Sequence, residues 1–289
     1  MAARFDFRRA ELAEIGRMAG WMAGYVLTTQ VTFVITSRVA TAASVHAPMA
    51  GISAYQNAYT MFLLPYTVIG VSVITALLPR MSRHADARKY WLLRADFSYS
   101  IRLSSAILVP AGLILAVLGP PLCELMFSYG TSSVSQARYI GEAFAVFSLG
   151  LVPFVIFQLM LRVFYAMHDS KTPAIAGFWT MAATVAGNYL VLAVLPAGQV
   201  VIGMAAVYGI TSVLSAALAG KWLLRRVGSL DGRKVVRSLT RMHMATVPAL
   251  IFTIAVTVIT VDGIACGDAS WGWKIGVVAR RRRRYLVRG

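Results

Sequence analysis

Long apolar stretches separated by short polar segments run along most of the 289-residue chain. A helix needs about 20 mostly apolar residues to cross the hydrocarbon of a bilayer, whereas open strands leave backbone groups unpaired in lipid. The pattern therefore predicts an all-α polytopic membrane protein with about seven transmembrane helices. The expected spans are Ala19–Val39, Ala50–Leu78, Ile101–Phe127, Gly141–Tyr165, Ala174–Leu195, Val200–Leu224 and Ala245–Ile264.

The polar segments between these stretches alternate in charge. "RMSRHADARKYWLLRADF" and "KWLLRRVGSLDGRKVVRSLTRMH" are rich in arginine and lysine, as is the N-terminal piece, whereas "SVHAPM" and "PAGQ" contain neither residue. Basic connections stay on the cytoplasmic side of a membrane. The alternation predicts a cytoplasmic N-terminus in a bacterial inner (plasma) membrane, with the basic connections on the same side.

The same pattern divides the chain into five parts. Residues 1–18 form a basic cytoplasmic segment, 19–226 a six-span lobe, 227–244 a basic cytoplasmic linker and 245–264 a seventh span. Residues 265–289 form an atypical tail whose arginines, 280–284, would lie outside after seven spans, against the charge rule. We interpret this tail as the result of truncation or a change of reading frame.

The composition and the spacing of reactive residues argue against nucleic-acid binding and against an enzyme. Only 13% of the residues are charged and 58% are hydrophobic, with a formal net charge of +17. Because the basic residues lie between apolar stretches, anionic lipid headgroups explain them better than nucleic acid. The two cysteines and four histidines have no metal-ligand spacing, and no nucleophile elbow or phosphate-binding loop is present. We therefore predict no enzyme, no cofactor and no metal.

Five polar residues inside the expected spans are candidates for a substrate cavity. In lipid, such side chains turn toward the bundle interior or a wet cavity. They form hydrogen bonds between helices, or they line a cavity and contact the sugar or peptide part of a headgroup. The candidates are Gln30, Asn57, Thr60, Gln158 and Asn188.

The stretch "LRVFYAMHDSKTP" predicts a tight cytoplasmic turn between two spans. Asp169 or Ser170 is suited to cap the helix that Pro173 opens. Arg162 and Lys171 are placed to meet the anionic inner leaflet. On these residues alone, structural anchoring explains the turn.

The same stretch resembles the cytoplasmic turn of the MurJ/MviN lipid II flippase family. "MFLLPYTVIGVSVITALLPRMSRHA" is similar to a helix of that family that ends in a basic exit, and "LMFSYGTSSVSQA" to its outer-loop signature. The resemblance covers roughly residues 8–242, with the motifs in matching order. It implies the second six-helix lobe of a multidrug/oligosaccharidyl-lipid/polysaccharide exporter fold, plus one added helix.

The resemblance also implies alternating-access transport of a polyprenyl-diphosphate-linked peptidoglycan precursor. The partners would be membrane lipid, the missing N-terminal lobe and, as further candidates, cell-wall or division proteins. Arg162, Asp169 and Lys171 would then serve in gating or in contact with inner-leaflet headgroups. Thr60 departs from the family pattern, because a basic residue is expected there to meet the diphosphate. The alternatives are a related drug or lipid-linked oligosaccharide exporter, a non-transporting membrane scaffold and a decayed remnant.

Overall fold

A computed structural model describes residues 9–128, 133–228, 237 and 239–254, and the side chains from residue 16 onward. All the elements in this part of the chain are helices. They are α1 (Arg9–Ser44), α2 (Ile52–Pro65), the π-helical turn η1 (Tyr66–Gly70), α3 (Val71–Asp86), α4 (Tyr90–Phe127), α5 (Val134–Leu149), α6 (Leu151–Ala166), α7 (Lys171–Val194), the 3₁₀ turn η2 (Ala197–Gln199), α8 (Val200–Val227) and a further helix, Leu239–Ile254.

Five of these segments are long and apolar enough to cross a membrane, and the bent pair α5 and α6 makes a sixth if it forms one span, which confirms the predicted all-α polytopic architecture. Four are single or continuous helices of 24 to 38 residues, built on α1, α4, α7 and α8. One combines α2, η1 and α3, and another is the bent pair α5 and α6. The helix Leu239–Ile254 begins inside the expected linker and is shorter than a span. The remainder of the expected seventh span and the whole arginine-rich tail lie outside the described residues.

The second span changes its helical winding just after Pro65. Proline has no N–H, so the bond that residue 65 would donate to Met61 is lost. The chain continues as the π-helical turn η1, in which the Val71 N–H donates to the Tyr66 carbonyl. Gly70 closes this turn because a Cβ atom there would lie 2.6 Å from the Tyr66 ring. Pro65 and Gly70 together therefore set the shape of the second span.

The fourth span was predicted as one helix but is broken into α5 and α6, which meet at 53°. The break falls at Gly150, between the two helices. Pro153 explains this position, because proline cannot bond the carbonyl of residue 149 and its ring clashes with it. Gly150 also lets the chain pass close to α8, since an added Cβ would lie 2.9 Å from the Gly209 Cα.

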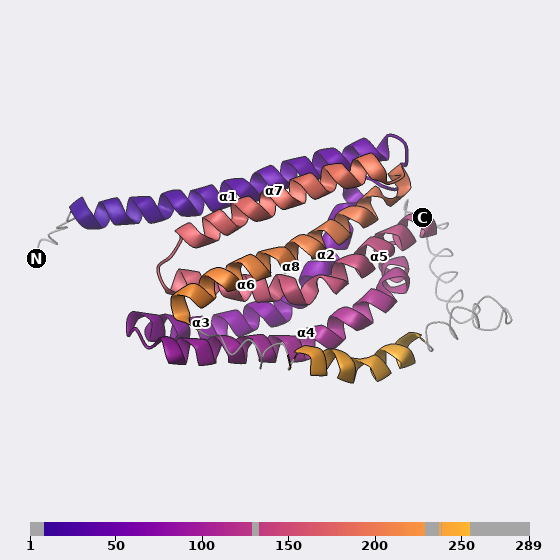
Figure 1. Ribbon diagram of the computed structural model, residues 1–289. Coiled ribbons are helices and arrows are strands. Elements are labelled where there is room, and N and C mark those ends of the chain that lie inside the picture. Colours follow the sequence, from indigo (N-terminus) through magenta and orange to yellow (C-terminus); the bar gives the residue numbers. More distant parts are fainter. Residues whose placement is uncertain (1–8, 129–132, 229–236, 238, 255–289) are drawn as a thin grey trace, which may run out of the picture.

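Charged residues gather at one end of the bundle. Figure 1 shows that the start of α7, the end of α8 and the turn between α3 and α4 share this end, on the left of the view. The opposite end carries the α1–α2 and α7–α8 connections. The basic residues at the first end include Arg80, Arg83, Arg88, Lys89, Lys171, Arg225 and Arg226.

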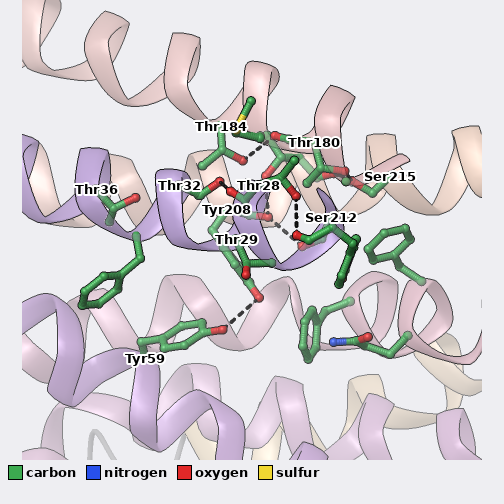
Figure 2. A pocket seen from close by; sticks show the side chains of 18 of the residues that line it. Thr28, Thr29, Thr32, Thr36, Tyr59, Thr180, Thr184, Tyr208, Ser212 and Ser215 are labelled. Carbon is green, nitrogen blue, oxygen red and sulfur yellow. Dashed lines mark hydrogen bonds between the residues drawn. The ribbon is translucent and has the colours of Figure 1, made fainter. Parts of the chain in front are cut away.

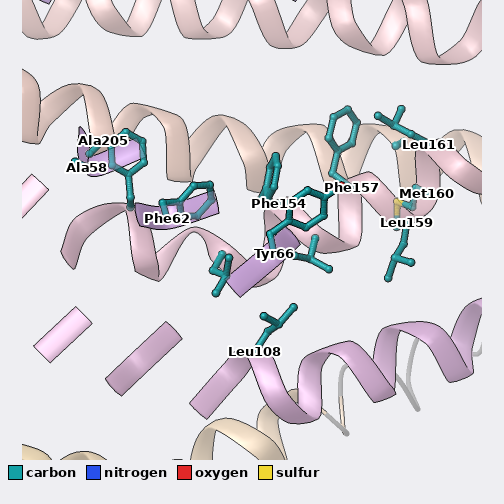
Figure 3. Packing of buried hydrophobic residues seen from close by; sticks show 14 of the residues in the cluster. Ala58, Phe62, Tyr66, Leu108, Phe154, Phe157, Leu159, Met160, Leu161 and Ala205 are labelled. Carbon is teal, nitrogen blue, oxygen red and sulfur yellow. The ribbon is translucent and has the colours of Figure 1, made fainter. Parts of the chain in front are cut away.

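An aromatic core holds the middle of the bundle together. Phe62 of α2 and Phe154 of α6 pack with ring centroids 5.4 Å apart, and both contact Tyr208 of α8. Phe147 of α5 joins the same cluster and is fully buried. Figure 3 shows Phe62, Tyr66 and Phe154 meeting between the helices. This core joins α2, α5, α6 and α8 and leaves α1 and α7 as a separate layer beside it.

Candidate functional site

A cavity of about 260 Å³ lies where the α1 and α7 layer faces α2, α6 and α8. Most of its lining residues bear a hydroxyl group, although methyl groups and aromatic rings supply most of the wall surface. None of its lining residues carries a charged side chain. The hydroxyl-bearing residues, apart from the tyrosines, are Thr28, Thr29, Thr32, Thr36, Thr180, Thr184, Thr211, Ser212 and Ser215.

Helical spacing explains how these hydroxyls come to share one wall. On α1, Thr28, Thr32 and Thr36 recur every fourth residue and so occupy one face of the helix. On α7, Thr180 and Thr184 do the same. Figure 2 shows these threonines converging on the cavity from two neighbouring helices.

Most of these hydroxyls donate to a carbonyl of their own helix. Thr32 Oγ1 donates to the Thr28 carbonyl at 2.8 Å, and Ser212 Oγ to the Tyr208 carbonyl at 2.7 Å. Thr180 Oγ1 of α7 also lies 2.7 Å from Ser215 Oγ of α8. Most of the hydroxyl donors are thus satisfied within the protein, and oxygen lone pairs remain available to accept hydrogen bonds from a ligand.

Aromatic residues and amides complete the wall. Tyr55 and Tyr59 come from α2, Phe154 and Phe157 from α6, and Tyr208 from α8. The Tyr59 and Tyr208 hydroxyls lie 3.5 Å apart, at the outer limit of a hydrogen bond. Gln56 and Gln158 add amide groups. An uncharged wall of hydroxyls, amides and ring faces suits a neutral, hydroxyl-rich ligand better than an ionic one.

Only one of the five predicted cavity residues lines the cavity. Gln158 lines the cavity, whereas Gln30, Asn57 and Thr60 are not among its lining residues. Gln30 is exposed, Asn57 is half-buried, and the exposed Thr60 donates its hydroxyl to the Gln56 carbonyl. Asn188 is buried next to the cavity and donates to Thr36 Oγ1 at 3.2 Å, so it joins α7 to α1.

Asp169 organises the turn between α6 and α7. Its Oδ1 accepts hydrogen bonds from the Lys171 and Thr172 backbone N–H groups at 3.1 and 3.0 Å. Its Oδ2 lies 2.9 Å from Arg226 Nη1, which ties the turn to the end of α8. Asp169 is thus the residue that caps α7, whereas the Ser170 side chain makes no capping bond. Lys171 is exposed, with its Nζ 5.7 Å from the centroid of the Trp21 ring.

Arg162 lies one turn before the end of α6. Its Nε is buried and has no hydrogen-bond partner in the described part of the chain. A buried guanidinium N–H without a partner is costly, so this group is suited to donate a hydrogen bond to an incoming acceptor atom.

Sequence reasoning missed a buried carboxylate near the same end of the bundle. Asp96 of α4 is 3% exposed. Its Oδ1 lies 2.9 Å from Arg80 Nη2 and its Oδ2 lies 2.8 Å from His84 Nδ1, and both partners belong to α3. Arg80 and His84 are four residues apart and so share a face of α3. That spacing, followed by the lone aspartate in "LLRADFSYS", was the signal that could have indicated the contact.

Comparison with known proteins identifies the relatives of this fold. A family model described as "Lipid II flippase MurJ" matches residues 1–265. The chain is 27% identical to the probable lipid II flippase MurJ of Rhizobium meliloti over 147 residues, which are 51% of this chain and 26% of that protein. It is 28% identical to the lipid II flippase MurJ of Burkholderia cenocepacia over 44% of this chain and 24% of that protein.

The probable lipid II flippase MurJ of Vibrio cholerae is 27% identical over 63% of this chain and 34% of its own length. A solved structure of a lipid II flippase MurJ in an inward closed conformation has the same fold. Its TM-score is 0.64 at 18% identity, over 91% of this chain and 53% of that one. The chain thus spans about half of that structure and between a quarter and a third of these curated relatives. Because the family model matches residues 1–265, which are most of the chain, the chain belongs to the MurJ lipid II flippase family.

Proposed function

We propose that this chain is one six-span lobe of a lipid II flippase of cell-wall synthesis, acting in the bacterial cell membrane by alternating access. The observation that carries the proposal is the uncharged, hydroxyl-lined cavity inside a bundle of this family's fold. A polar path through the protein spares the headgroup from entering hydrocarbon, where unpaired polar groups are costly. The polyprenyl tail stays in lipid throughout.

The chemistry of the cavity favours contact with the neutral sugar part of the precursor. Hydroxyl oxygens accept from sugar hydroxyls, and the Gln158 amide both donates and accepts. A diphosphate needs cations, best supplied as arginines, and no lining residue is cationic. We therefore assign diphosphate recognition to a first lobe, which makes that lobe a required partner. Alone, this chain is expected to insert but not to transport.

Three residues at the basic end are proposed to act in gating or in contact with inner-leaflet headgroups. The unpartnered, buried Nε of Arg162 supports a contact that forms only in one transport state. The Asp169–Arg226 pair supports a hinge that holds α7 to α8 while other helices move. Lys171 is exposed beside Trp21, as suits a residue at the membrane interface.

The orientation belongs to the same proposal. The basic turns gather at one end of the bundle, which supports a cytoplasmic position for that end and for the N-terminus. The headgroup would enter from this side and leave at the end that carries the α1–α2 and α7–α8 connections.

Two matched glutamine variants test the role of the cavity. The chain is co-reconstituted with the first lobe of a relative in vesicles, and translocation is scored by the accessibility of the precursor headgroup. Gln158→Leu should slow translocation roughly five-fold, as expected for the loss of one neutral hydrogen bond. Gln30→Leu removes the same amide from an exposed position outside the cavity and should change the rate by less than about two-fold. Equal rates for the two variants, or transport by the chain alone, would overturn the proposal.

A further inference from the structure

A second pocket, of about 270 Å³, lies between the first turn of α7 and the last turns of α8. Thr172 and Ile175 line it from α7, and Trp222, Arg225 and Arg226 line it from α8. It shares no lining residue with the hydroxyl-lined cavity. The pocket combines two guanidinium groups with an indole ring and an aliphatic side chain.

Its two arginines differ in what they already bind. Arg226 Nη1 is held by Asp169 Oδ2 at 2.9 Å, yet about half of the side chain remains exposed. A guanidinium has five N–H donors in a planar fork, so one ion pair leaves others free to bind an anion. Arg225 is exposed and makes no ion pair with the residues that the structure describes. Two neighbouring arginines in this state favour a phosphate group.

The surroundings of the pocket favour a phosphate that carries an apolar attachment. Trp222 is half-buried at the end of a membrane span, where indole rings prefer the boundary between headgroups and hydrocarbon. Ile175 adds an aliphatic surface one turn into α7. A free phosphate ion makes no use of either side chain, whereas a phospholipid places its glycerol and acyl chains against both.

The same combination recurs on the other side of the α7 start. There Arg17, Trp21 and Lys171 line a pocket of about 290 Å³ together with Asp169, and Lys171 lies over the Trp21 ring. Residues of the first turn of α7 thus line two pockets, each with one tryptophan and at least two basic residues. This repetition is expected where a helix start is held against a layer of anionic headgroups.

We propose that the pocket of Trp222, Arg225 and Arg226 binds the phosphate of an anionic phospholipid. The binding chemistry follows from the pocket itself, and only the assignment to the inner leaflet rests on the orientation proposed above. The bound phosphate shares Arg226 with Asp169, so the lipid becomes part of the contact that joins the α6–α7 turn to α8. Phosphate from another source, free in solution or on a polyprenyl diphosphate, has the same chemistry and is separated by experiment.

Binding is measured on the purified full chain in a neutral detergent by native mass spectrometry, as the apparent Kd of the first lipid adduct. Phosphatidylglycerol is the probe, and phosphatidylcholine with the same acyl chains is the zwitterionic control. Arg225→Gln should weaken phosphatidylglycerol binding by about ten-fold, the expected effect of losing one charge-assisted hydrogen bond. Lys221→Gln is the matched control, because Lys221 is exposed on α8, has the same charge and does not line the pocket. It should change the Kd by less than about two-fold.

Further arms separate the sources of phosphate. Excess inorganic phosphate and a polyprenyl diphosphate are each added as competitors, and phosphatidylglycerol should persist at the pocket against inorganic phosphate. The proposal is overturned if both variants weaken binding equally, which would indicate general surface charge. It is also overturned if phosphatidylcholine binds as tightly, or if either competitor displaces phosphatidylglycerol at equal concentration. Because the measurement involves no transport, its failure would leave the proposed flippase role untouched.

Discussion

Two aspartates at the basic end of the bundle each pair with a histidine, but only one of them is buried. Asp96 is 4% exposed at its side chain and pairs with both Arg80 and His84, whereas the Asp86 side chain is 61% exposed and pairs with His168 at 3.2 Å. Water screens the exposed pair, so it contributes little to stability. The buried carboxylate depends on its partners, which makes the α3–α4 contact the stronger one.

This difference predicts unequal costs for the same substitution. Asp96→Ala should lower the free energy of unfolding by about 2 kcal/mol, less than for a fully buried pair because Arg80 is itself half exposed. Asp86→Ala should lower it by less than about 0.5 kcal/mol. Detergent-induced unfolding followed by far-UV circular dichroism measures both. Similar losses for the two variants would show that burial of Asp96 does not set its contribution.

Asp169 combines a helix cap with an ion pair, and two substitutions separate the two roles. Asp169→Asn keeps an oxygen for the Lys171 and Thr172 N–H groups but loses the charge that pairs with Arg226. It should cost about 1 kcal/mol of unfolding free energy, and Asp169→Ala about 1 kcal/mol more, the typical contribution of a cap.

A double-mutant cycle with Arg226→Gln provides the control for the ion pair. Once Arg226 is replaced, Asp169→Asn should cost almost nothing further, because the pair is already broken. Costs that simply add would contradict the pairing. Both are read from the same unfolding transition.

The sequence was sufficient to narrow the cap of α7 to Asp169 or Ser170, because capping is local. Polar residues followed by a proline and an apolar run identify a helix start, and the structure then selects Asp169, whose carboxylate accepts from the N–H groups of the first turn. Asp96 was missed because its partners lie 12 and 16 residues away on another helix. Among the cavity candidates, polarity alone could not separate Gln158 from Gln30, since their difference lies in which way each helix face turns.

At the scale of the elements, the break between α5 and α6 shapes the contact with α8. The stretch 141–165 is mostly apolar, so its hydropathy alone predicts one straight span and not a 53° bend. Pro153 and Gly150 are the only local signals in that stretch, and both occur in straight membrane helices too. What the sequence does not show is the close approach of Gly150 to Gly209 of α8, which depends on how the helices pack.

Adding one methyl group at the break should therefore disturb helix packing. In Gly150→Ala the new Cβ lies 2.9 Å from the Gly209 Cα, so backbone has to move and the cost should be about 1–3 kcal/mol. Gly198→Ala adds the same methyl where no atom lies within 4 Å and should change the unfolding free energy by less than about 1 kcal/mol. Thermal unfolding in detergent compares them, and equal midpoints would argue against a tight α5–α6 crossing of α8.

At the scale of the whole molecule, α1 is the least covered span. Many of its large apolar side chains are exposed, among them Trp21, Val26, Leu27, Val31 and Phe33. Lipid tails and a neighbouring lobe are both apolar, so composition cannot distinguish a lipid-facing helix from one that meets another lobe. This is why the sequence was sufficient for an all-α polytopic architecture but not for the surface on which the proposed first lobe would pack. Residues of α1 also line the cavity, so this helix separates the cavity from whatever covers its exposed face.

The orientation of the bundle gives a prediction for the entire chain. The experiment uses two exposed positions at opposite ends of the bundle, His46 in the α1–α2 connection and Arg83 near the end of α3. Both native cysteines are first changed to alanine, and each position is then replaced by cysteine in a separate variant. A membrane-impermeant maleimide applied to the outer face of the inner membrane should label His46→Cys, whereas Arg83→Cys should react only after permeabilisation. The physical reason is the cluster of basic turns, which anionic lipids and the insertion machinery retain on the inner side.

The reverse labelling would place the basic end outside and remove the inner-leaflet role proposed for Arg162, Asp169 and Lys171. Labelling of both positions in intact membranes would mean that the chain has no fixed orientation by itself. Co-expression with the proposed first lobe should then restore one-sided labelling if contacts with α1 fix the orientation. The inner-leaflet role proposed for these residues thus depends on the orientation, and this single pair of cysteines tests the orientation directly.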